Sequence, residues 1–124
     1  MPVFARLRDE VLTITVDGDY TANELRRVAF AAFESDDTPA QFPILMDMSG
    51  AAGVLSKSVE ELKAMGAIFG AHRDRISKLG VVAAADAHGV FAVDSPFADE
   101  AGVPVRACHS HADVKAWFGG EGTF

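Results

Sequence analysis

The sequence predicts an α/β sandwich whose elements follow the order β-β-α-β-α-β-α-β-α. Three observations support this prediction. Short apolar runs alternate with amphipathic stretches that begin at helix-capping residues. Strands separated by helices pair through crossovers, so most of the sheet is expected to be parallel. The first two strand-like runs have no helix between them, which predicts an antiparallel hairpin at the N-terminal edge of a mixed sheet.

Each element has a local signal. The hairpin is predicted over residues 3–7 and 11–16, where apolar residues alternate with threonines in the second run and Asp9-Glu10 forms the turn. The three later strands are predicted in the apolar runs "ILMDM", "LGVVAAAD" and "VPVRAC". The first two of these runs are nearly continuous, as in strands that are buried on both faces.

Four helices are expected to begin at hydroxyl residues whose side chains can accept a hydrogen bond from the backbone of the first turn: Thr21, Ser58, Ser95 and Ser110. The helix after Ser58 is predicted to continue to about residue 78, with a core stripe that includes Ile76. Phe30 is expected on the polar side of the first helix, where a partner surface could begin.

The size and composition indicate one domain over residues 1–124, because 124 residues with 49% hydrophobic content can bury one core. Lys and Arg total 11 against 18 for Asp and Glu, a net charge of −7, which argues against binding to nucleic acid. Apolar stretches are too short for membrane insertion, and the N-terminus lacks a signal-peptide pattern. We therefore expect a cytoplasmic location.

Several polar residues are expected where strands end, at the edge where α/β proteins often bind ligands: Asp17, Asp47, Ser49, Asp86, His88, Cys108, His109 and His111. Their spacing matches no metal-binding or catalytic motif. Cys108 is the only cysteine, which excludes an intrachain disulfide and a cysteine-rich zinc site. We expect a protein without a metal, a cofactor or an enzymatic activity; an enzyme built on Asp47, Asp86 and His88 is the least favoured alternative.

The connection from Ser49 to Ser58 is longer than usual between a strand and a helix, and it contains the small residues "SGAAG". Backbone amides at Gly50 and Gly53 could approach a partner or an anion closely. We predict that this loop belongs to a protein-binding surface.

The helix that follows has a second face with few large side chains, namely Ala64, Ile68 and Ala71. Gly66 and Gly70 lie one turn apart on the same helix. Glycine is unfavourable inside a helix, so these two residues indicate close packing, either against the sheet or against another chain. We predict that this face extends the partner-binding surface, and a homodimer is one form that the interaction could take.

The order of elements, together with "LMDMSG", "LGVVAAAD" and the closing "ADVKAWF", resembles the STAS domains, and most closely their SpoIIAA-like (STAS/SEC14-like) branch. The resemblance covers essentially the whole chain. It implies a STAS-like fold and a regulatory role like that of bacterial anti-sigma-factor antagonists, in which a partner kinase phosphorylates a serine at the start of the second helix. Matching "DMSG" directly makes Ser49 the acceptor, whereas matching by strand, the register we prefer, places the switch at Ser56 and Ser58.

Two functions therefore remain open. The first is a non-enzymatic regulatory module that binds a protein partner, with the phospho-switch altered because "LSKS" lacks the acidic residue and the glycine of the family motif. The second is a carrier or sensor of a small apolar ligand, which the SEC14-like comparison implies. Its candidate pocket would be lined by Met65, Phe69, Phe91 and Phe97.

Overall fold

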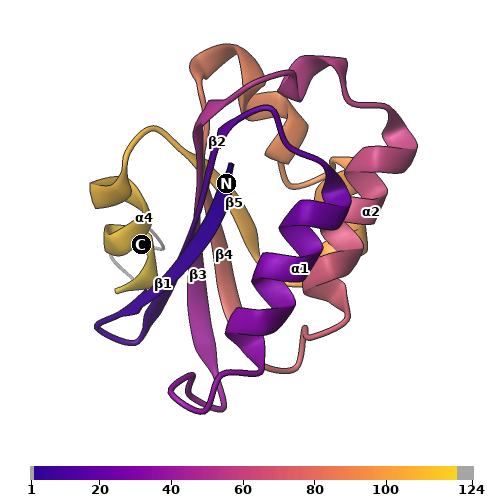
Figure 1. Ribbon diagram of the computed structural model, residues 1–124. Helices are drawn as coiled ribbons and strands as arrows, with labels where there is room; N and C mark the ends of the chain where they lie inside the picture. Colours follow the sequence, from indigo (N-terminus) through magenta and orange to yellow (C-terminus); the bar gives the residue numbers. More distant parts are fainter. Residues whose placement is uncertain (1, 120–124) are drawn as a thin grey trace.

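The computed structural model describes residues 2–119, which form one five-stranded sheet with helices on both faces (Figure 1). The strands are β1 (Val3–Arg8), β2 (Val11–Gly18), β3 (Phe42–Ala51), β4 (Ile76–Val82) and β5 (Val105–Cys108). The α-helices are α1 (Ala22–Phe33), α2 (Val59–Gly70), α3 (Pro96–Ala101) and α4 (His111–Phe118), and two 3₁₀ segments are η1 (Val54–Ser56) and η2 (Ala85–Phe91).

The strands lie in the sheet in the same order as in the chain, from β1 to β5. Strands β1 and β2 are antiparallel, and every later neighbour pair is parallel. The predicted fold class is therefore confirmed. The predicted hairpin turn is also present, with Asp9 at φ 53° and Glu10 at φ 66°. Two consecutive residues with positive φ are typical of the tight turn that matches the twist of a hairpin.

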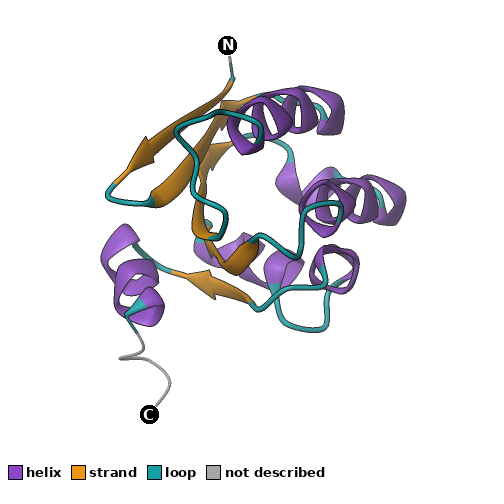
Figure 2. Ribbon diagram, turned by 90° about the horizontal axis from the view of Figure 1, so that it is seen from below, coloured by secondary structure: helices purple, strands orange, loops and turns teal. Residues whose placement is uncertain are grey.

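The two faces of the sheet are covered unequally. Helices α1, α2 and α3 lie on one side, whereas α4 lies on the other (Figure 2). The larger core fills the three-helix side and includes Ile44 and Met46 of β3. Leu45 points to the opposite face, where it joins a small cluster with Val114 of α4. This alternation is the period-two pattern of a strand that is buried on both faces.

Helix α2 is shorter than predicted. It ends at Gly70, and Ile76 begins β4 rather than closing a helical core stripe. The intervening turn is held by Arg75, whose guanidinium donates hydrogen bonds to the carbonyl oxygens of Phe33 at 2.6 Å and Pro39 at 3.0 Å. These partners lie about forty residues away in the sequence, so no local pattern could have revealed the turn. The predicted strand over residues 79–86 likewise begins earlier and ends at Val82.

The glycines of α2 pack against α3 of the same chain. A Cβ atom at Gly66 would collide with the carbonyl oxygen of Phe97, and one at Gly70 with that of Glu100. The close neighbour is therefore neither the sheet nor a second chain, which corrects both predicted alternatives. Among the helices of residues 2–119, none is long and apolar enough to span a membrane.

Candidate functional site

The segment between β3 and α2 lies at the edge of the sheet where the parallel strands end (Figure 1). Strand β3 continues to Ala51, so this connection covers residues 52–58 and is shorter than predicted. Gly53 adopts a left-handed conformation with φ 72° and leads into the short turn η1. In this turn Val54 is buried, whereas Leu55 is 62% exposed. The turn thus anchors one apolar side chain and presents the next one to solvent.

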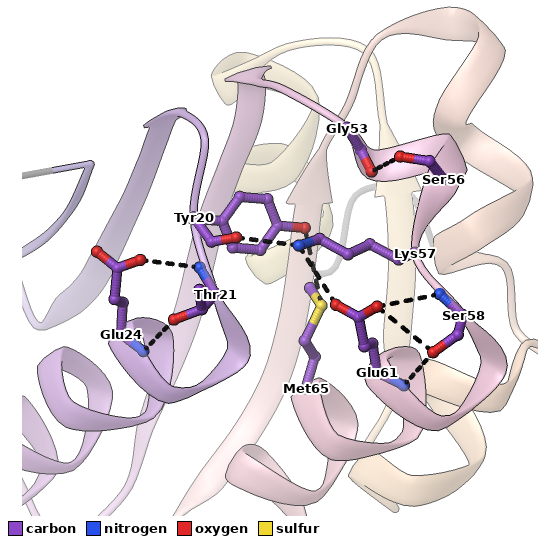
Figure 3. A network of polar contacts seen from close by, with 9 residues as sticks. All are labelled: Tyr20, Thr21, Glu24, Gly53, Ser56, Lys57, Ser58, Glu61 and Met65. Carbon is purple, nitrogen blue, oxygen red and sulfur yellow. Dashed lines mark hydrogen bonds and ion pairs between the residues drawn. The ribbon is translucent and has the colours of Figure 1, made fainter.

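Lys57 connects this segment to the start of α1 (Figure 3). Its ammonium donates a hydrogen bond of 2.9 Å to the carbonyl oxygen of Tyr20, lies 4.3 Å from the centre of the Tyr20 ring and forms an ion pair of 3.5 Å with Glu61. The Tyr20 hydroxyl in turn donates to the sulfur of Met65 at 3.7 Å. The contacts of Lys57 and Tyr20 therefore anchor the segment to the start of α1 and to α2.

Burial raises the pKa of Tyr20 to about 12, and the negative charge of Glu61 acts in the same direction. Lys57 lies in the predicted loop, but sequence patterns did not predict Tyr20 as part of the site or the contact between these two residues. The Lys57–Glu61 spacing of four residues is a recognisable local signal for an ion pair. The contact between Lys57 and Tyr20 spans 37 positions and has no such signal.

The three candidate serines occupy different environments. Ser49 lies within β3, where its hydroxyl donates to the Asp47 carboxylate at 2.6 Å. The hydroxyl of Ser56 is exposed and donates to the carbonyl oxygen of Gly53 at 2.9 Å. Ser58 is the N-cap of α2 and accepts a hydrogen bond from the backbone of Glu61 at 3.1 Å. Ser49 and Ser56 are both exposed and cap no helix, but Ser49 is bound to a carboxylate whereas Ser56 donates only to a backbone carbonyl oxygen.

A small hollow of about 260 Å³ separates η1 from η2, with Leu55 and Ser56 on one side and Asp86 and Ala87 on the other. Val59, in the first turn of α2, is also 52% exposed. We call the group formed by Leu55, Ser56 and Val59 the η1 surface. Exposed aliphatic side chains therefore lie on either side of Ser56 in the sequence, on a segment that Lys57 anchors to Tyr20.

The predicted partner-binding residues are only partly accessible. Gly50, Gly53, Ala64 and Ala71 are exposed. Ile68 is only 3% exposed and belongs to the core, which corrects its assignment to an exposed helix face. Phe30 also differs from its prediction: it is half-buried, with its ring 4.9 Å from that of His72. The exposed side of α2 is thus narrower than the sequence predicts.

The polar residues at the strand ends form two separate groups rather than one site. Asp47 accepts hydrogen bonds from Ser49 and contacts Nε2 of His111 at 2.8 Å. His88 lies against His109, with the ring centres 4.4 Å apart. Within residues 2–119, no group of three or more His, Cys, Asp or Glu side chains is placed to hold a metal ion.

In the first group the carboxylate lies between the serine and the histidine. The imidazole does not contact the Ser49 hydroxyl, so it is not placed to remove its proton as in a catalytic triad. Partial burial of Asp47 would raise its pKa, but the hydrogen bonds from Ser49 and His111, together with the charge of His111, lower it below its ordinary value. The group therefore acts as a hydrogen-bonded link between β3 and α4.

The four residues of the candidate apolar pocket do come together in the core. Met65, Phe69, Phe91 and Phe97 are each fully buried, and the Phe97 ring lies 5.9 Å from that of Phe69 and 5.1 Å from that of Phe91. Such edge-to-face packing is ordinary for aromatic side chains in a protein core.

The chain matches none of the family models against which we compared it, and none of the curated proteins. The geometry of the described residues is therefore the basis on which a function can be argued.

Proposed function

We propose that the chain is a cytoplasmic, non-enzymatic regulatory module that binds a protein partner through the η1 surface. The observation that carries this proposal is the presentation of Leu55. Its side chain is 62% exposed at the tip of a short turn that Val54 and Lys57 anchor to the body of the domain. An apolar side chain held on an ordered segment loses little conformational entropy on binding, which favours its use as an anchor.

The resemblance to STAS domains also favours the η1 surface as the regulatory region. In the register that matches by strand, Ser56 and Ser58 correspond to the segment that carries the phospho-acceptor. A phosphate on Ser58 would disturb its hydrogen bonds to Glu61 and place two negative groups together. Ser56 is the more suitable acceptor, because its hydroxyl is exposed and only one hydrogen bond to Gly53 would be lost.

Phosphorylation of Ser56 would place about two negative charges beside Leu55. The nearest cation of the loop, Lys57, already contacts Glu61 and the Tyr20 carbonyl, so it is poorly placed to neutralise them. We therefore propose that the modified form binds its partner more weakly than the unmodified form, because a charged group is costly to bury in an apolar contact.

Site-specific photo-crosslinking in the cells that make the protein would test the proposal. A benzophenone side chain at position 55 is expected to give one crosslinked species of defined mass. The matched control carries the same group at Ala112, an exposed residue of α4 on the other face of the sheet. Ser56→Glu combined with the probe at position 55 is expected to reduce the product several-fold.

The proposal fails if positions 55 and 112 give the same products, since the η1 surface would then have no selectivity. It also fails if no product forms at position 55 in the cells of origin. If the Ser56→Glu variant still gave the crosslinked product, the η1 surface would stand as the binding surface. The proposal that phosphorylation of Ser56 weakens binding would then be wrong.

A further inference from the structure

The outer face of β1 and β2 carries a groove that lies apart from the η1 surface. Helix α4 covers β3, β4 and β5 on this side of the sheet (Figure 2). Between α4 and the hairpin is a hollow of about 230 Å³, lined on β1 by Phe4, Arg6 and Arg8. Thr13 and Thr15 of β2 form its floor, and His111 and Lys115 of α4 form the opposite wall. We call this hollow the hairpin groove.

The sequence period explains why these side chains meet. On β2, Leu12, Ile14 and Val16 are buried in the core, so the intervening threonines face outward. Arg6 lies opposite Thr13 in the hairpin register, which places it on the same outer face. On α4, His111 and Lys115 are four residues apart and therefore share one side of the helix.

The hairpin groove is lined by positively charged side chains, although the chain as a whole carries a net negative charge. Arg6, Arg8 and Lys115 line it, and within residues 2–119 none of their three side chains forms an ion pair or a hydrogen bond. The carboxylate close by, Asp47, already contacts His111 and Ser49. A chain with a net charge of −7 thus keeps three unpaired cations around one small hollow.

We propose that the hairpin groove binds a small anion that carries a phosphate group. Arginine forks and a lysine ammonium are donors without acceptor capacity, and phosphate oxygens accept charge-assisted hydrogen bonds from both. The threonine hydroxyls on the floor add two further donors. Because the cations come from β1 and from α4, they approach the hollow from two sides, as an anion with several oxygens requires.

The size of the hollow indicates a small ligand. A volume of about 230 Å³ lies below the roughly 300–1,000 Å³ that is usual for drug-sized molecules. A phosphate or pyrophosphate group with a short organic portion is of suitable size. The exposed Phe4 ring at one end supplies an apolar contact for that portion.

Binding of pyrophosphate, followed by isothermal titration calorimetry and by backbone amide shifts at low ionic strength, would test this inference. We expect saturable binding with shifts confined to residues 4–15 and 111–115. The double variant Arg6→Gln/Arg8→Gln is expected to bind at least about tenfold more weakly, because two charge-assisted contacts are lost. The matched control is Arg26→Gln/Arg27→Gln on α1, which removes the same charge from exposed positions elsewhere.

Equal weakening by the two double variants would overturn the proposal, because it would show a response to net charge alone. Absence of saturable binding by the wild-type chain would also overturn it. Binding to vesicles that contain phosphatidic acid, without binding of free pyrophosphate, would exclude a small soluble ligand. Thermal unfolding by circular dichroism confirms that each variant is folded, and Lys115→Gln provides an independent test from the α4 wall.

Discussion

Tyr20 shows how one buried side chain links stability to pH. Its pKa is raised from 10.0 to about 12, chiefly by burial and in addition by Glu61. The folded state therefore favours the neutral phenol. The stabilisation is complete below pH 10.0 and is lost as the pH rises towards 12, because the unfolded chain releases the proton first.

Tyr20 is the only tyrosine, so absorbance at 295 nm reports its ionisation directly. We expect a titration midpoint near pH 12 in the folded protein. Urea unfolding is expected to show that Tyr20→Phe gains stability relative to the wild type between pH 8 and pH 11, because phenylalanine does not ionise. A midpoint near 10 would show that Tyr20 is exposed and that Lys57 does not hold it in place.

Residue-level contacts also explain what the sequence could predict of the candidate site. The capping roles of Ser58 and Glu61 follow from a spacing of three residues and are confirmed. Ser49 lies in strand β3 and Ser56 lies in the turn η1. Predicting these two environments would have required the correct end of β3, which the sequence analysis placed too early. The Lys57–Tyr20 contact and the hairpin groove depend on segments far apart in the chain, so no local pattern indicated them.

At the scale of elements, the contact between α2 and α3 depends on two glycines. Ala is favoured over Gly in a helix by about 1 kcal/mol, but a Cβ at position 66 would collide with the carbonyl oxygen of Phe97. Backbone cannot rotate away as a side chain can, so α3 must shift. Overpacking of this kind costs roughly 1–3 kcal/mol or more.

We therefore expect Gly66→Ala to lower the free energy of unfolding by roughly 1–2 kcal/mol in urea titrations, despite its better helix propensity. Gly89→Ala is the matched control, because nothing lies within 4 Å of a Cβ at that position and its φ is not left-handed. The control is expected to be neutral or slightly stabilising. An equal response of the two variants would show that α3 does not pack tightly against α2.

Elements with signals at both ends were predicted correctly. The helix after Ser95 has an N-cap, a proline in its first turn and Gly102 at its C-terminus, and α3 begins and ends there. Helix α2 has a capping box at its start but no equivalent stop signal, so its predicted end was wrong. The burial of Ile68 could not be predicted either, because it depends on tertiary packing around α2.

At the scale of the whole molecule, Cys108 is placed where global unfolding would expose it. It is the only cysteine, it is 4% exposed, and it lies in the small cluster between the sheet and α4. Burial raises the pKa of its thiol; Asp113 acts in the same direction and Arg106 opposes it. The reactive thiolate is therefore disfavoured as well as shielded.

We expect a thiol reagent such as dithionitrobenzoate to modify Cys108 slowly, at a rate that rises with urea in parallel with unfolding. The Ala107→Cys/Cys108→Ala variant moves the thiol to a half-exposed position on the same strand and should react much faster. If the wild type reacted as fast as this variant, α4 would open independently of the rest of the domain.

The order of the strands also has a consequence for how the protein forms during its synthesis. Each strand from β2 onward pairs with the one made just before it, so no strand has to be inserted between two others that are already joined. Such a sheet can grow from one edge as the chain leaves the ribosome, and each new strand finds a partner already in place. Strand β5 and helix α4 are made after the other four strands, and α4 then covers the second face of the sheet.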